Sequence, residues 1–139
     1  MPYPAEYQRA TDQFANFLAD ARDAANLGSR HQAYTMAQGV FQAFRRRLKI
    51  RDAILFAGVL PVGLRALFVA DWNPDEPRKS FESMDTMVEE VQALRSEHNF
   101  SPDTAIRDVA IALRKNVDEI EFAQVLDNLP KGARDFWKC

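Results

Sequence analysis

LPVGLRALF at residues 60–68 and LPKGARDFW at residues 129–137 decide how this chain folds. Four of the nine positions are identical, namely the leucine, the proline, the glycine and the arginine, and the last two positions are apolar in both stretches. Proline disfavours helical geometry in the residue before it, and its fixed φ suits the first turn of a helix. We therefore expect a corner at each stretch, where one helix ends at the leucine and the next opens at the proline (Leu60 and Pro61, Leu129 and Pro130).

The likeness of the two stretches extends upstream as an internal repeat. When Pro61 is aligned with Pro130, apolar positions from residue 37 to residue 60 fall on apolar positions from residue 106 to residue 129 without a gap. Further upstream one residue must be skipped, and Phe14 then meets Met84. Apolar residues recur every three or four positions, as in amphipathic helices, and no stretch keeps the two-residue period of a strand. We predict an all-α protein of about eight helices, in two pseudo-equivalent repeat units packed into one bundle.

The repeat predicts a first helical unit (residues 1–70), a linker (71–80) and a second helical unit (81–139). The linker DWNPDEPRKS has two prolines and mixed charge. Each unit of about 60 residues is marginal alone, so we expect one shared core. The side chains expected to be most buried are Phe14, Phe41, Phe44, Leu60, Val88, Val109, Leu113 and Leu129.

Residues that favour helix ends refine this prediction. An apolar stripe predicts the first helix from Tyr7 to Ala24, and Gly28 could close it in the left-handed conformation. In the second unit, Asp118 and Glu121 have the spacing of a capping box for the helix before the corner.

The corner motif also carries an arginine four residues after each proline, at Arg65 and Arg134. Together with RRRL at residues 45–48 and the short helix before each corner, it resembles a bacterial family known as domain of unknown function 2267. The resemblance covers roughly residues 10–137. It implies a small, soluble, all-helical bacterial protein, and it implies no activity, cofactor or catalytic residue.

Most catalytic and cofactor chemistries lack their residues in this chain. Neither glycine-rich phosphate-binding motif is present, and the single cysteine, Cys139, excludes a thiolate zinc site and an internal disulfide. His31 and His98, in corresponding loops, could form a pH-sensitive or metal-binding pair, but solvated loop residues are the favoured interpretation because further ligands are not evident. Glu89 and Glu90 could act as an acid–base pair, although adjacent helix positions diverge and a solvated face is favoured. We expect no cofactor, no metal and no catalytic residue.

Arg65 and Arg134 allow two interpretations. The helix opened by Pro61 could hold an anion at its free amides, with Arg65 beside it. A structural ion pair between helices is favoured, with Asp52 and Glu121 as the matched acidic partners.

The densest charge feature is RRRLKIR at residues 45–51, with five cations: Arg45, Arg46, Arg47, Lys49 and Arg51. Residues 1–70 carry nine Lys and Arg against five Asp and Glu, and residues 71–139 carry nine against fifteen. The favoured interpretation is that the run complements the dipole of a helix C-terminus, and the alternative is an exposed docking patch for an acidic protein, a nucleic-acid backbone or anionic lipid. Since the second unit has no cation at the positions equivalent to Arg47, Lys49 and Arg51, we expect the corner itself not to need these three charges.

Three classes of function remain open from the sequence. We favour a non-enzymatic, cytoplasmic helical module for protein interaction or an accessory role, whose partner is another protein or a second copy of the chain. The alternatives are weak nucleic-acid association through residues 45–51 and small-ligand binding in a pocket between the repeats. With a net charge of −2 and no apolar run long enough to span a bilayer, neither nucleic acid nor membrane is expected as a partner.

Overall fold

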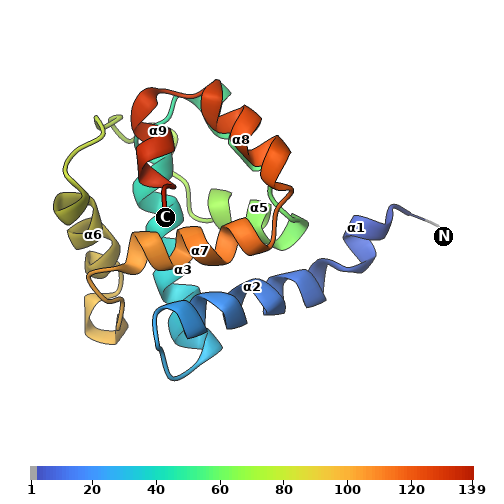
Figure 1. The fold of residues 1–139 in the computed structure, drawn as a ribbon. Helices are drawn as coiled ribbons and strands as arrows, with labels where there is room; N and C mark the ends of the chain where they lie inside the picture. The colour runs from blue at the N-terminus through green and yellow to red at the C-terminus, as the bar shows by residue number, and fades with distance from the viewer. Residues whose placement is uncertain (1–2) are drawn as a thin grey trace.

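The computed structural model describes residues 3–139, and within this range it contains helices and no strand (Figure 1). The prediction of an all-α protein is therefore confirmed. The described chain has one α-helix more than the eight expected, because the first predicted helix breaks at Arg9 into two. In chain order the helices are α1 (Ala5–Gln8), α2 (Ala10–Ala24), α3 (Arg30–Arg45), α4 (Ile50–Ala57), α5 (Val62–Val69), α6 (Met84–Ala93), the 3₁₀ helix η1 (Ser96–His98), α7 (Ala105–Lys115), α8 (Glu119–Asp127) and α9 (Lys131–Phe136).

The helix boundaries agree with the predicted repeat on both sides of each corner. Helices α4 and α8 begin at positions 50 and 119, and α5 and α9 begin at positions 62 and 131, so both pairs of helices start at equivalent places in the repeat. Pro61 and Pro130 immediately precede α5 and α9, with φ of −56° and −54°. That two whole units superpose stays a prediction.

Helix α2 of the first half and helix α6 of the second half each pack against the opposite half of the chain. Helix α2 runs beside α7 and also contacts α3, and α6 packs on α3 (Figure 1). Helices α3 and α6 are so close at Gly39 that a Cβ atom there would lie 2.9 Å from the backbone oxygen of Val91. The two halves are therefore interlocked.

The core lies between the halves and centres on Trp137. Its side chain is fully buried, and its ring centroid lies 5.2 Å from that of Phe44 in α3 and 5.5 Å from that of Phe56 in α4. Phe122 of α8 and Phe136 of α9 approach the same ring at 6.2 Å and 5.1 Å. One aromatic cluster therefore contains rings from both halves of the chain.

Burial agrees closely with the sequence expectation. Seven of the eight side chains expected to be most buried are 8% exposed or less. Phe14 differs, because it lies at the edge of the core. There it covers Gly63 and packs edge to face on Tyr34, at a centroid distance of 6.4 Å.

The glycine of the repeated motif makes room for an aromatic ring. A Cβ atom on Gly63 would lie 2.9 Å from Cδ1 of Phe14, and one on Gly132 would overlap the ring of Phe81. Both glycines lie in the first turn of a helix, with Phe14 and Phe81 packed directly above them. This close contact explains why both copies of the motif have glycine at the same place.

Alanine at either position should destabilise the protein. Alanine in a helix is normally more stable than glycine by about 0.5–1 kcal/mol, but here the added methyl group must displace a ring at a cost of about 1–3 kcal/mol. Urea unfolding of Gly63→Ala and Gly132→Ala measures the balance. Gly28→Ala, in the loop before α3, is a control for the added methyl group alone, because a Cβ there would lie 3.4 Å from its nearest neighbour, an ordinary contact. Equal or greater stability of both corner variants would contradict this explanation of the motif.

Two expectations about helix ends have different outcomes. Asp118 caps α8, since its side chain accepts hydrogen bonds from two backbone N–H groups of the first turn, but among the described residues no hydrogen bond returns from its N–H to the Glu121 side chain, so only half of the expected capping box forms. Gly28 does not take the left-handed conformation after α2. Asn26 takes it instead, with φ of 55°, and asparagine is the residue after glycine that adopts this conformation most readily.

Candidate interaction site

The basic run lies where α3 ends and α4 begins, and its five cations fall into two groups. Arg45 and Arg47 are buried, at 4% and 3% exposed, whereas Arg46 is partly buried and Lys49 and Arg51 are exposed. Arg45 and Arg47 are therefore not part of an exposed patch, because both guanidinium groups are engaged inside the fold.

Arg45 holds the C-terminal end of α5. Its Nη1 donates hydrogen bonds to the backbone oxygens of Phe68, at 2.9 Å, and Ala70, at 2.7 Å. Its guanidinium lies 5.4 Å from the ring centroid of Trp72. Burial, followed by the neighbouring charge of Arg46, lowers the pKa of Arg45. The last carbonyls of a helix lack donors within it, so Arg45 supplies what the end of α5 needs.

Arg114, at the position of the second unit equivalent to Arg45, does the same at the end of α9. Its Nε and Nη2 donate to the backbone oxygen of Trp137 at 3.0 Å and 2.9 Å. Its Nη1 lies 3.4 Å from Glu119, and its guanidinium lies 5.1 Å from the ring centroid of Phe122. Sequence reasoning missed this role, although a signal existed: Arg45 is the only cation of the run matched by an identical residue at the equivalent position.

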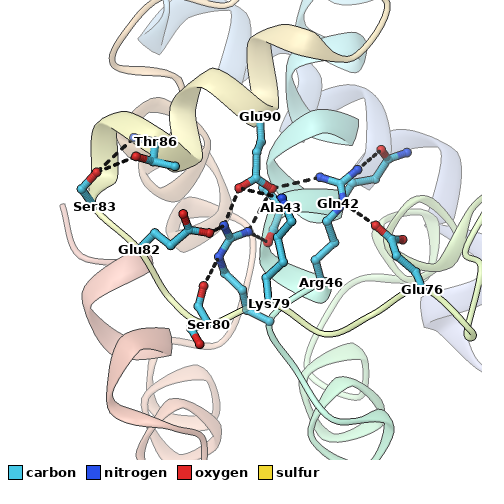
Figure 2. A network of polar contacts seen from close by, with 11 residues as sticks. Gln42, Ala43, Arg46, Glu76, Lys79, Ser80, Glu82, Ser83, Thr86 and Glu90 are labelled. Atoms are coloured by element: carbon cyan, nitrogen blue, oxygen red, sulfur yellow. Dashed lines mark hydrogen bonds and ion pairs between the residues drawn. The ribbon is translucent and has the colours of Figure 1, made fainter.

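Arg47 joins α3, the linker and α6. Its side chain is fully buried and pairs with Glu90 of α6 and, at 2.9 Å, with Glu82. It also donates to the backbone oxygens of Ala43, at 2.7 Å, and Ser80, at 3.0 Å. Figure 2 labels the carboxylates of this network, Glu90 on α6 and Glu82 just before α6. Each nitrogen of this guanidinium therefore donates to an acceptor within the fold.

A smaller contact occupies the matching place in the second half. Asn116, the equivalent of Arg47, donates to the backbone oxygen of Ala112 at 2.7 Å and to the carboxylate of Asp20 at 2.9 Å. Asp20 lies on α2, as Glu90 lies on α6. The residue beyond the end of α3, Arg47, is thus bonded to α6, and the residue that follows α7, Asn116, is bonded to α2.

Glu90 is the electrostatic centre of the network. Burial alone would raise the pKa of its carboxyl group, but the hydrogen bond and charge of Arg47, with the charges of Lys79 and Arg46, hold that pKa below its ordinary value. Arg46 lies 3.3 Å and Lys79 lies 3.8 Å from its carboxylate (Figure 2). Glu89 beside it is exposed. The pair expected on a solvated face is therefore divided, and Glu90 is bound to cations.

The stability contributed by Glu90 should depend on pH. A carboxyl group whose pKa is lower in the folded state stabilises the fold above its unfolded pKa, about 4.3, and loses that contribution as the pH falls through the folded value. The unfolding free energy of Glu90→Gln should therefore fall furthest below wild type near pH 7, and the gap should shrink below about pH 4. Urea unfolding at several pH values measures this, with Glu89→Gln as the control. A gap that persists unchanged at pH 3 would contradict the ion-pair assignment.

An open hollow of about 470 Å³ lies between the end of α3, the start of α4 and the linker. Four cationic side chains line it, with Glu76 as the one carboxylate, and Glu76 is already bonded to Arg46 at 2.9 Å. Among residues 3–139, Lys49, Arg51 and Arg78 are exposed and form no ion pair. The lining cations are Arg45, Arg46, Lys49 and Arg78.

The motif arginines do form ion pairs, but not with the expected partners. Arg65 pairs with Glu6 of α1 at 3.2 Å and donates to the backbone oxygen of Leu60 at 2.8 Å. Arg134, largely exposed, pairs with Asp127 of α8. The expected partners, Asp52 and Glu121, form no ion pair in the part of the chain that the structure describes, because each arginine reaches a nearer carboxylate.

The repeated corner and the helices around it are the features that a family comparison can test. A family model described as an uncharacterized conserved protein (DUF2267) matches residues 14–136. The chain belongs to the DUF2267 family. The match includes both corners and the whole basic run, in agreement with the resemblance seen in the sequence. No curated protein matches the chain significantly.

Other candidate sites of this DUF2267 member are dispersed. His31 lies in the first turn of α3 and stacks on Tyr34 at 6.3 Å, while His98 lies in η1. No group of three or more potential metal-binding side chains occurs within residues 3–139. In the same range, no helix has both the length and the apolar character needed to cross a bilayer.

Proposed function

We propose that this DUF2267 protein is a non-enzymatic interaction module of the cytoplasm that docks an acidic surface of a protein partner at the basic hollow. The observation that carries the proposal is a local cluster of exposed cations without a carboxylate partner among the described residues: Lys49 and Arg78 line one open depression, and Arg51 follows its lining residue Ile50 in the chain. An acidic partner would supply the missing counter-charges. The sole cysteine, at the last position, suits a reducing compartment.

The use of the perturbed titratable groups supports a binding role over an enzymatic one. Shifted pKa values occur at catalytic sites and also in structural ion-pair networks. Here Arg45 bonds backbone oxygens and Glu90 bonds Arg47. Burial raises the pKa of Asp108, whose carboxylate accepts a hydrogen bond from Thr104 at 2.7 Å. All three have structural partners.

Partner capture with matched variants tests the proposal. Pull-downs at low and moderate salt compare three tagged proteins: wild type, the hollow variant Lys49→Glu/Arg78→Glu and the control Arg9→Glu/Arg30→Glu. Light scattering detects self-association. Exposed ion pairs are weak and are screened by salt, so we expect capture by wild type and the control at low salt, less at moderate salt and none by the hollow variant. Equal capture by all three proteins would overturn the docking site, and capture of nucleic acid alone would replace the protein partner.

A further inference from the structure

The hollow differs from the matching place in the second half by the loss of two carboxylates. At the start of α8, Asp118 accepts hydrogen bonds from the backbone N–H groups of Ile120 and Glu121, both at 3.0 Å. The next residue, Glu119, lies 3.4 Å from Arg114. One carboxylate therefore caps the helix, and its neighbour neutralises the arginine.

In the first half neither carboxylate is present. The residues equivalent to Asp118 and Glu119 are Lys49 and Ile50. Lys49 has the same extended backbone conformation as Asp118, but no side chain of the described residues caps α4. The N–H groups that begin α4 therefore keep their partial positive charge without an acceptor.

A buried side chain gives a second, independent indication. Arg45 is 4% exposed, its Nε has no hydrogen-bond partner, and no carboxylate pairs with it among the described residues. Its counterpart Arg114 has Glu119. Asp71 and Glu76 act on Arg45 only from a distance, and a carboxylate in direct contact, supplied from the adjoining hollow, would offset more of the cost of burying this cation. Arg45 and the Trp72 ring beneath its guanidinium both line the hollow.

We propose that the hollow binds an acidic peptide segment of the partner, in which one carboxylate caps α4 and the adjacent carboxylate pairs with Arg45. The proposal rests on the docking function proposed above and specifies its ligand. The chain's own Asp118–Glu119 pair is the template for two neighbouring carboxylates at this spacing. Lys49 and Arg78 add positive charge at the rim, and Trp72 and Ile50 provide apolar surface for the peptide between its charges.

The sharpest test titrates an acidic peptide into wild type and into a variant that has the two missing carboxylates at positions 49 and 50. The probe is a fluorescein-labelled peptide with two Asp-Glu pairs, and the control peptide has Asn-Gln at the same places. In low salt the acidic peptide should bind wild type, and Lys49→Asp/Ile50→Glu should weaken its binding at least tenfold. That variant should melt no lower than wild type, because it restores the cap. Arg30→Asp reverses one cation, as Lys49→Asp does, at the other end of α3, about 22 Å away, and should bind within twofold of wild type.

Amide chemical shifts then locate the peptide on wild-type protein. Titration with the acidic peptide should move the resonances of Ile50, Arg51 and Asp52 first. Equal binding of the Asn-Gln peptide, unchanged binding by Lys49→Asp/Ile50→Glu, or static resonances at the start of α4 would each overturn the proposal. Displacement of the peptide by a tighter-binding single-stranded oligonucleotide at these same amides would overturn it in favour of nucleic acid. If partner capture depends on Lys49 and Arg78 but the acidic peptide does not bind, the docking function stands and this ligand is wrong.

Discussion

Replacing Arg47 with methionine should lower the free energy of unfolding by about 3–5 kcal/mol. The guanidinium is fully buried, and it bonds the Glu90 carboxylate and the backbone oxygens of Ala43 and Ser80. Methionine keeps much of the side-chain length but donates no hydrogen bond. Glu90, itself 15% exposed, would lose its closest counter-charge, and removing one member of a buried ion pair is typically this costly. Urea unfolding followed by circular dichroism measures the loss.

Graded substitutions separate Arg47 from the exposed cations of the run. Asparagine at 47 keeps one donor for Ala43, as Asn116 does for Ala112, so Arg47→Asn should cost less than methionine but still be measurable. Arg51→Ile, on the exposed surface, should change stability by less than about 0.5 kcal/mol. If Arg47→Met is as stable as Arg51→Ile, the network in Figure 2 contributes little to the fold.

The sequence predicted where the helices lie better than how they pack. Apolar periodicity and the two prolines determine local structure, and α5 and α9 therefore begin directly after Pro61 and Pro130. The pairing of α2 with α7 could not be predicted this way. An amphipathic stripe shows that a helix buries one face, and it is equally compatible with either half of the chain as the neighbour.

The basic run shows the corresponding limit for the site. Residue type alone does not distinguish Arg45, Arg47 and Arg51, because a guanidinium can extend into solvent or fold back onto carbonyls; only the match of Arg45 with Arg114 in the repeat sets one of them apart. Arg45 and Arg47 are buried only because the end of α5 and the acidic residues of α6 lie beside them in space. The exposed positions, Lys49 and Arg51, do agree with the sequence expectation of exposed charge at this corner.

The other large effect is expected in the core, where Phe44→Ala should cost about 3–5 kcal/mol. The ring is fully buried and lies 4.7 Å from Phe56, 5.0 Å from Phe136 and 5.2 Å from Trp137, centroid to centroid. Its removal loses the transfer free energy of the ring and leaves a cavity. Since the neighbouring rings come from separate elements in both halves, no single helix can shift to fill that cavity without losing contacts elsewhere.

Leu113→Ala and Phe100→Ala determine whether that loss reports on the shared core. Leu113 of α7 is fully buried in the other half, so its truncation should cost about 2–5 kcal/mol in the same single transition. Phe100 is 61% exposed, and Phe100→Ala should change stability by less than about 0.5 kcal/mol. Two separate transitions in either core variant would show that the halves unfold independently, contrary to a core built around Trp137. If Phe44→Ala and Leu113→Ala each lower the free energy of unfolding by less than about 1 kcal/mol, the two side chains are not packed as the structure shows.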